Sequence, residues 1–236
     1  MWVTTEISQD PCLVENIRAE LSKTEILSSL RSFEVKTLLS LPRLQAVYAE
    51  TLRLRVHVIV PRETNTENLQ INKWVFPNKS TIVVSSQPAH MDSTVWNLGP
   101  NKSHPTNTFW AERFLAYEYS PASGPISKPS VVVTTDLGEN APEDSGSDSK
   151  APKFVLSSTA GHWFPYGGGA RICPGRHFAK RAIMTATAVM ISMFDIEIMA
   201  TSEAMKMDKS GYGLGMQRPA GNIRYRMRRA KSEQSI

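Results

Sequence analysis

The chain has 236 residues and a formal net charge of +5, from 27 lysines and arginines against 22 aspartates and glutamates. Hydrophobic residues make up 41% and charged residues 21%, an ordinary soluble balance, and the length allows one substantial core or two small domains. The positive excess is small and scattered, which argues against nucleic-acid binding, although the C-terminus is basic from Arg224 onward. The two cysteines, Cys12 and Cys173, indicate no disulfide framework and favour a reducing compartment.

No run of about 18 apolar residues occurs, so the sequence predicts no transmembrane helix, and its first residues do not form a signal peptide. Residues 1–8 read as the end of a helix. Pro11 after Asp10 predicts the start of the next helix, whose apolar stripe comprises Leu13, Ile17 and Leu21. We expect a further short helical region over residues 25–39.

The middle of the chain changes from helix to strand. Leu41 and Pro42 open a strong helix over residues 41–54, with apolar side chains at helical spacing. Alternation from Val56 predicts a strand that ends at Pro61. Beyond it we expect a hairpin of residues 74–76 and 81–84 around a Pro77–Asn78 turn, one helical turn over 92–97, and a compact segment over 109–115.

Residues 120–150 are dominated by Ser, Pro, Gly, Asp and Glu and predict a disordered surface insertion, because such a segment buries too little apolar area to offset its ordering entropy. Order is expected to return at residues 154–156. A helix over 174–193, a strand over 194–198, a turn over 211–215 and a final strand over 222–228 complete the chain. These elements predict a mainly helical α+β fold.

The segment of residues 163–175 carries the strongest chemical signal. It is rich in glycine and places Arg171 two residues before Cys173, and Pro174 suits the first turn of a helix. A helix N-terminus favours a thiolate, and a thiolate is a ligand that haem iron accepts. Gly169 and Gly175 would let a flat macrocycle approach the backbone, and Arg171 would bind a carboxylate of it.

Three other readings of this segment are weaker. A lone cysteine after a glycine-rich turn is usually an inert structural residue. Cys173 and His177 lie one helical turn apart and suit zinc, but further ligands are missing from the pattern. The triple glycine suits phosphate, but the Walker lysine and the dinucleotide-binding spacing are both absent.

Two further motifs precede the cysteine segment in the chain. Glu50 and Arg53 form an E-x-x-R pair on the predicted helix, and residues 109–114 read Phe-Trp-Ala-Glu-Arg-Phe around Arg113. In this order, the three motifs resemble the E-x-x-R, P-E-R-F and haem-binding motifs of the cytochrome P450 superfamily. The resemblance covers nearly the whole chain and implies the C-terminal part of that fold, with its K-helix, meander, cysteine loop, L-helix and small β-sheets, as one domain over residues 1–236.

The resemblance implies haem b as the cofactor, with Cys173 as its axial thiolate and metal ligand. It implies a buried structural triad of Glu50, Arg53 and Arg113 behind the haem. The residues that would bind the cofactor are Tyr166, Gly167, Gly169, Arg171 and Gly175. The residues that would contact the substrate are Val56, His57, Val58, Ile59 and Met216, although plain sheet core explains the first four equally well.

The implied reaction is oxidation of a lipophilic small molecule with O2 and electrons from an NADPH-dependent reductase, which would dock on Arg176, Lys180 and Arg181. A solvated helix face is the ordinary alternative for those three residues. The complete enzyme would lie on the cytosolic face of the endoplasmic reticulum membrane. Two other functions stay open: a catalytically inactive haem-binding remnant, and a reductase-independent isomerase or synthase of the same fold.

The sequence departs from the family pattern at several points. Ala111 stands where proline is commoner, and Tyr166 stands where phenylalanine is usual. The chain lacks three parts that the family pattern leads us to look for: the long central helix with the acid and threonine of the oxygen site, the membrane anchor, and most of the substrate pocket. We therefore expect this chain to be a truncated C-terminal portion that is inactive by itself. Residues 175–180 and 215–219 resemble a branch known from sterol and prostanoid oxidation and from fungal secondary metabolism.

Overall fold

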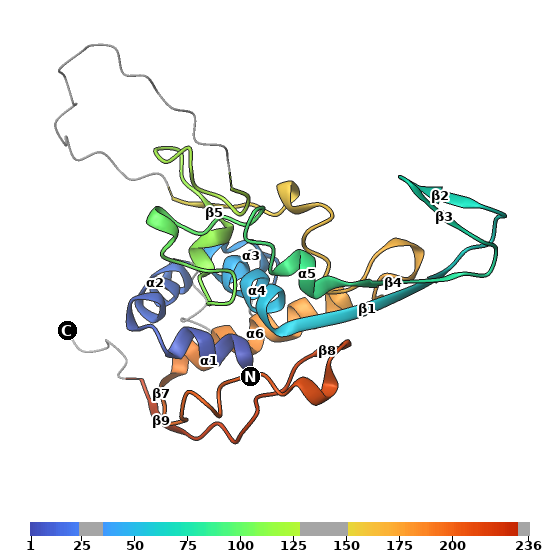
Figure 1. Cartoon of the computed structure of the whole chain (residues 1–236). Helices are drawn as coiled ribbons and strands as arrows, with labels where there is room; N and C mark the ends of the chain where they lie inside the picture. The colour runs from blue at the N-terminus through green and yellow to red at the C-terminus, as the bar shows by residue number, and fades with distance from the viewer. Residues whose placement is uncertain (24–34, 128–150, 231–236) are drawn as a thin grey trace, which may run out of the picture.

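The computed structural model describes residues 1–23, 35–127 and 151–230, in which a cluster of helices carries small antiparallel sheets (Figure 1). The helices are α1 (Trp2–Ser8), α2 (Pro11–Ser22), α3 (Val35–Ser40), α4 (Pro42–Arg55), α5 (Ser86–His90) and α6 (Arg176–Met193). The strands are β1 (Val56–Glu63), β2 (Leu69–Ile71), β3 (Trp74–Phe76), β4 (Thr81–Ser85), β5 (Leu115–Ala116), β6 (Lys153–Phe154), β7 (Phe194–Ile198), β8 (Leu214–Met216) and β9 (Tyr225–Arg229). Short 3-10 helices occupy Pro100–Lys102, Ala111–Phe114, Ser157–Thr159, Gly169–Arg171 and Lys209–Gly211.

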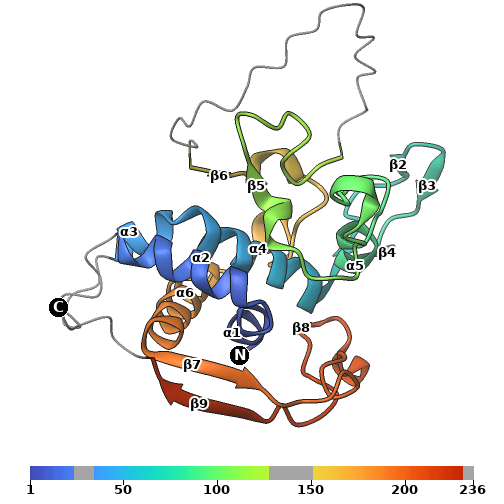
Figure 2. The same ribbon diagram turned by 90° about the vertical axis from the view of Figure 1, so that its left-hand side faces the viewer.

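The helical core forms where the apolar stripes of α1, α2, α4 and α6 meet. The side chain of Asp10 accepts a hydrogen bond from Leu13 N at 3.1 Å and caps α2, which buries the predicted stripe. Burial of each large aliphatic side chain contributes about 1.5–3 kcal/mol. The main cluster includes Leu13, Ile17, Leu21, Leu44, Val47, Leu52, Met184, Ala188 and Ile191. Figure 2 shows β7 and β9 as a ribbon along one side of these helices.

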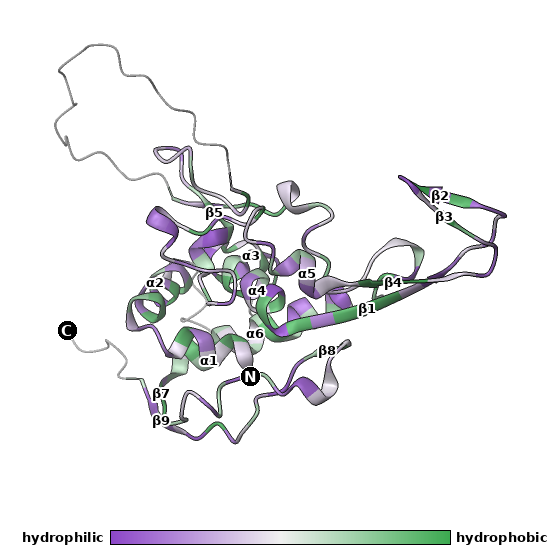
Figure 3. Cartoon of the chain, viewed as in Figure 1, coloured by the Kyte–Doolittle hydropathy of each residue, from purple (hydrophilic) through white to green (hydrophobic). Residues whose placement is uncertain are grey.

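Strand β1 continues directly from α4 and lies between β4 and β8, antiparallel to both. The predicted end at Pro61 is wrong, because the strand runs on to Glu63. Ile59 N–H points away from β4 and donates to Gly213 O at 3.2 Å. Backbone nitrogens two residues apart in a strand point to the same side, so the nitrogen of Pro61 also points away from β4. It lies beyond the end of β8, where no hydrogen-bond partner is needed. Proline therefore removes no hydrogen bond from the β1–β4 ladder. The apolar start of β1 is visible in Figure 3.

The predicted hairpin is also wrong in its pairing. Strand β3 pairs with β2, across a tight turn at Asn72 and Lys73, and β4 pairs with β1 instead. Asn72 has a φ of 54°, which asparagine tolerates, and this closes the turn. The expected turn at Pro77 is present, with Ser80 N–H donating to Pro77 O at 3.2 Å, but it joins β3 to the following strand without pairing the two.

Several expected boundaries move. Helix α6 begins at Arg176 instead of residue 174, ends at Met193 as predicted, and is followed by β7 over the expected residues. The final strand is shifted to Tyr225–Arg229 and pairs with β7. The segment 92–97 forms a single turn, in which Trp96 N–H donates to Asp92 O at 3.0 Å.

The expected insertion at 120–150 begins with described residues that make specific contacts. The Asn97 side chain donates to Ala122 O and Gly124 O, and Ser127 N–H donates to Val95 O at 2.7 Å. The expectation of disorder is wrong for residues 120–127, and residues 128–150 lie outside the described residues. Residues 25–34 of the expected second helical region also lie outside the described residues. The rest of that region falls in α3.

Candidate functional site

The cysteine segment folds back on itself after Tyr166. Gly167 and Gly169 have φ values of 74° and 68°, a backbone region that favours glycine. Cys173 N–H donates to Tyr166 O at 3.0 Å and closes the loop. Cys173 lies three residues before the start of α6, so the predicted position at the helix N-terminus is wrong by one turn. Its thiol is free and exposed.

Three contacts fasten this loop to the helices beneath it. Trp163 Nε1 donates to Ala49 O at 3.1 Å, and Phe164 N–H donates to His90 Nε2 at 3.1 Å. The hydroxyl of Tyr166 forms a short hydrogen bond with the hydroxyl of Tyr48 on α4. Burial raises the pKa of Tyr48, so this pair is neutral at physiological pH. The cysteine loop therefore has a position fixed by α4 and α5.

A cavity of about 560 Å³ opens beside the cysteine. Its walls come from β1, the cysteine loop, α6 and β8, and they are mainly apolar. Two arginines, Arg62 and Arg171, belong to the lining together with Cys173. The remaining lining includes Leu52, Val56, Val58, Ile59, Val60, Tyr166, Gly167, Gly168, Ile183, Leu214 and Met216.

Most of the residues predicted for cofactor and substrate contact reach this cavity: Tyr166, Gly167, Arg171, Val56, Val58, Ile59 and Met216. Gly169 and Gly175 are not in its lining. His57 is not there either, because it is buried with its ring 5.6 Å from that of Tyr212.

The sequence interpretation missed Arg62. This residue lies at the far end of β1, lines the cavity and donates to Gly168 O in the cysteine loop. The signal was available, since Val56, Val58, Val60 and Arg62 alternate and so share one face of the strand. The predicted strand end at Pro61 concealed it.

The three charged residues of the E-x-x-R and P-E-R-F resemblances meet in the protein interior. Arg53 binds Glu50 through two hydrogen bonds of 2.7 and 2.8 Å, and Arg113 Nε lies 3.3 Å from Glu50 Oε1. All three side chains are fully buried. Backbone groups complete the cluster: Trp110 N–H donates to Glu50 at 3.1 Å, and Arg53 donates to His90 O at 2.6 Å. Burial lowers the pKa of Arg113, an effect opposed by the Glu50 charge.

His90 connects this charged cluster to the cysteine loop. Its backbone carbonyl accepts from Arg53 and its Nε2 accepts from Phe164 N–H, so the ring is neutral. Burial, followed by the nearby charges of Arg53 and His57, lowers the pKa of His90 to about 3. The unfolded chain binds the same proton with a pKa of about 6.5.

Stability is therefore expected to fall on mild acidification. Between about pH 6.5 and 3 the unfolded state binds more protons at His90 than the folded state does, so folding is favoured above this window and is weakened as the pH falls through it. His90 should account for about 2 kcal/mol of loss between pH 6.5 and 5. Urea unfolding at several pH values, in the unmodified chain and in His90→Asn, measures this. The variant should lose that part of the pH slope, whereas His162→Asn should keep it; parallel curves for His90→Asn would contradict the prediction.

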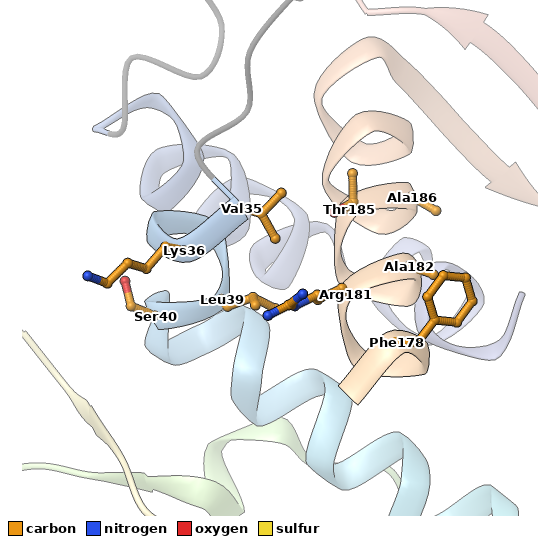
Figure 4. A pocket seen from close by; sticks show the side chains of 9 residues that line it. All are labelled: Val35, Lys36, Leu39, Ser40, Phe178, Arg181, Ala182, Thr185 and Ala186. Atoms are coloured by element: carbon orange, nitrogen blue, oxygen red, sulfur yellow. The ribbon is translucent and has the colours of Figure 1, made fainter. Parts of the chain in front are cut away.

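The basic residues predicted for reductase docking differ in their surroundings. Lys180 is half-buried, donates to Gln45 Oε1 at 3.0 Å and lies 5.9 Å from the centre of the Tyr48 ring. Arg176 donates to Cys173 O at 3.0 Å. Arg181 is exposed and lines a groove of about 810 Å³ between α3 and α6, together with Leu39 and Phe178 (Figure 4). The three residues thus do not form one free basic patch.

Comparison with known proteins identifies the family. The sequence profile of "Cytochrome P450" matches residues 1–122 and 147–225. The chain belongs to the cytochrome P450 family. It is 36% identical over 97% of its length to "Cytochrome P450 monooxygenase efuG" of Hormonema carpetanum, and 35% identical over 98% to "Cytochrome P450 monooxygenase fsoE" of Humicola fuscoatra. It spans 40% and 39% of those two relatives.

The fold agrees with this assignment. A crystal structure of a cytochrome P450, CYP102L1, matches 97% of the chain with a TM-score of 0.64 at 19% sequence identity, and the match covers 41% of that protein. The expected α+β part of the cytochrome P450 fold is confirmed. Among the described residues no helix is long and apolar enough to cross a bilayer.

Membership of this family implies haem, and the residues of the cavity fit it. An exposed cysteine, largely apolar walls and two arginines line one volume of about 560 Å³. Iron, an apolar macrocycle and its two carboxylates require these same three kinds of group. The volume also lies within the range of about 300–1,000 Å³ typical of ligand pockets.

Proposed function

We propose that this chain forms the cysteine-ligand side of a haem-thiolate monooxygenase that oxidises a lipophilic small molecule. The observation that carries the proposal is the placement of the Cys173 thiol on an apolar cavity that Arg62 and Arg171 also line. The fungal relatives named as monooxygenases support the same reaction class. Residues 1–236 then represent the C-terminal portion of one cytochrome P450 domain.

The protein groups have separate roles in this proposal. Cys173 would hold the haem iron through its thiolate, and a haem bound in this way would supply the activation of O2. Arg62 and Arg171 would bind its two carboxylates, because a guanidinium group pairs with a carboxylate through a charge-assisted hydrogen bond. The bonds of the cysteine loop to Tyr48, Ala49 and His90 hold the sulfur in place. Glu50, Arg53 and Arg113 stabilise the helix from which those contacts come.

The substrate side of the site is apolar. Val56, Val58, Ile59 and Met216 line the cavity, and together with Leu214 they would exclude water from a bound molecule and favour a lipophilic one. His57 is removed from the proposed contacts because it packs against Tyr212. By the resemblance to the family, the complete enzyme operates on the cytosolic face of the endoplasmic reticulum membrane.

The test of the proposed function is a haem titration of the purified chain, followed by a carbon monoxide difference spectrum of the reduced complex. The proposal expects saturable binding of one haem and the long-wavelength band of a thiolate-bound carbon monoxide complex. Failure to bind haem, or a spectrum without that band, would overturn it. Rearrangement of a peroxide substrate without any reductase would instead favour an isomerase or synthase.

Electrons in this proposal come from an NADPH-dependent reductase that docks near Arg176, Lys180 and Arg181. Arg181 is the most accessible of the three, so Arg181→Glu should slow reduction of the bound haem by about three- to tenfold at low salt, since surface charge mainly sets the encounter rate. Stopped-flow reduction at low and high salt measures this. Lys206→Glu, which reverses an exposed charge elsewhere on the surface, is the control; equal rates for the two variants would argue against docking at this face.

A further inference from the structure

One turn of helix α4 contacts the chain on both sides of Cys173. Tyr48 forms a hydrogen bond between hydroxyl groups with Tyr166, which precedes the cysteine. Gln45 Oε1 accepts a hydrogen bond of 3.0 Å from Lys180 Nζ, and Lys180 follows the cysteine on α6. Cys173 lies midway between Tyr166 and Lys180 in the sequence. Since Gln45 and Tyr48 are at i, i+3 positions of α4, one face of that helix binds both flanks of the cysteine segment.

The ammonium group of Lys180 is directed at α4. Besides its bond to Gln45, it lies 5.9 Å from the centre of the Tyr48 ring, within the range of a cation–π contact. Lys180 is half-buried, and burial lowers the pKa of its ammonium group. Arg181, the next residue, is exposed and lines the groove between α3 and α6 instead (Figure 4). The two neighbouring cations of α6 therefore have different surroundings, and those of Lys180 are internal.

The Gln45 side chain is oriented for this contact. Its Nε2 donates to Ser40 O at 3.3 Å. Because the amide nitrogen is bound to a carbonyl, the amide oxygen is the atom left to accept a hydrogen bond from an ammonium group. The contact between Gln45 and Lys180 therefore depends on the junction of α3 and α4 as well as on the two side chains.

Tyr48 provides the partner that the Tyr166 hydroxyl requires. Burial raises the pKa of both tyrosines, so the two hydroxyls are neutral. Tyr48 is 4% exposed, and a buried hydroxyl costs free energy if it has no hydrogen-bond partner. The backbone oxygen of Tyr166 in turn accepts from Cys173 N–H at 3.0 Å. A movement of Tyr166 would therefore move the backbone that carries the cysteine.

From these contacts we propose that Gln45, Tyr48 and Lys180 are positioning residues that together form a clamp for the Cys173 sulfur. The three side chains are not in the lining of the cavity, so they act through Tyr166 and α6. The clamp holds the cysteine segment at both flanks and keeps the sulfur where it can bind iron as a thiolate. This role rests on the proposed haem-thiolate function for its effect on iron, but the fixing of the loop is measurable in the haem-free chain.

Hydrogen exchange of the Cys173 amide in the haem-free chain tests the clamp, because this N–H is bonded to Tyr166 O. Tyr48→Phe and Lys180→Met should each speed its exchange by about tenfold, since local opening of the loop becomes more frequent. Amides in the buried middle of α6 should keep their rates, which separates loosening of the loop from global unfolding. Lys206→Met, at an exposed lysine elsewhere, is the matched control. An unchanged rate in either clamp variant, or an equal acceleration in α6, would overturn the proposal.

A double substitution distinguishes the hydroxyl pair from a packing effect. Tyr48→Phe leaves the hydroxyl of Tyr166 without its partner, whereas Tyr48→Phe combined with Tyr166→Phe removes both hydroxyls. Because replacement of both partners by apolar groups is often nearly neutral, the double variant should return the Cys173 rate to within about threefold of the unmodified rate. A double variant that exchanges as fast as Tyr48→Phe would contradict the role of the hydroxyl pair.

The carbon monoxide difference spectrum of the haem-bound chain tests the effect on the sulfur. Lys180→Met should move part of the complex from the long-wavelength thiolate band to a shorter wavelength, and Lys180→Arg, which keeps a donor and a cation, should restore the band. Faster exchange with an unchanged thiolate band would show that the clamp does not position the sulfur. If the unmodified chain itself lacks the thiolate band, the proposed function fails, and the exchange rates still decide whether the clamp exists.

Discussion

Replacement of Arg53 by alanine is expected to lower the free energy of unfolding by about 3–5 kcal/mol, the usual cost of removing one partner of a buried ion pair. The buried guanidinium group donates two hydrogen bonds to Glu50 and one to His90 O, and it lies 5.4 Å from the Trp96 ring. Its removal leaves Glu50 with Arg113 at 3.3 Å and leaves His90 O without its donor. Since domains have only about 5–15 kcal/mol of stability, the variant should be largely unfolded or unable to retain haem.

Urea unfolding followed by circular dichroism measures this effect. Lys206→Ala is the matched control, because Glu203 and Lys206 have the same i, i+3 spacing but side chains that are 75% and 64% exposed. That pair should contribute no more than about 0.5 kcal/mol. Arg53→Lys should fall between the two, since it keeps the charge but not the paired geometry. A loss near that of Lys206→Ala would show that the buried cluster does not stabilise the fold.

The sequence predicted the helices best where local and tertiary signals agree. Asp10 and Pro11 start α2, the stripe at Leu13, Ile17 and Leu21 faces the core, and Pro42 opens α4. In each case the signal lies within one or two turns of the helix. Helix α6 began later than expected because Pro174 suits a first helical position but also suits the tight turn that follows Cys173.

The strand pairings were not predictable in the same way. Two apolar segments on either side of Pro77 and Asn78 satisfied the local rule for a hairpin, yet β4 pairs with β1, a partner about twenty residues away in the sequence. The pairing of β4 with β1 depends on the direct continuation of helix α4 into strand β1, which places β1 beside the cysteine loop. A pairing between segments that far apart leaves no local signature in the sequence. Arg62 was missed for a separate reason, since the predicted strand ended at Pro61, one residue too early to include it.

The site itself was predictable as a set of residues but not as an arrangement. The motif at Cys173 identified a residue that the fold places on the cavity wall, and the E-x-x-R and P-E-R-F resemblances identified the charged residues that the fold brings together. His90 was missed. It links Arg53 to Phe164 through its backbone carbonyl and its side chain, and no spacing in the sequence predicts such a link. The partial burial of Lys180 was missed for the same reason, since Gln45 on α4 is distant in sequence.

Cys173→Ser is expected to abolish the thiolate signature and to weaken haem binding by at least about a hundredfold. A hydroxyl is a poor ligand for haem iron. Even the loss of a residue that only hydrogen-bonds to a metal ligand commonly costs about 10–100-fold in metal affinity, so loss of the ligand itself should cost more. Cys173 is exposed, so the same change should alter the free energy of unfolding by no more than about 0.5 kcal/mol. The variant thus separates haem ligation from folding, which Arg53→Ala does not.

Haem titration and the carbon monoxide difference spectrum measure the effect, with Cys12→Ser as the matched control. Cys12 is the other free and exposed cysteine, at the start of α2, and its replacement should leave both measurements unchanged. If haem affinity and spectrum survive in Cys173→Ser but fail in Cys12→Ser, the ligand has been assigned to the wrong cysteine. If both variants bind haem as the unmodified chain does, the cavity beside Cys173 holds haem without the sulfur, and the proposed oxygen chemistry has no thiolate to support it.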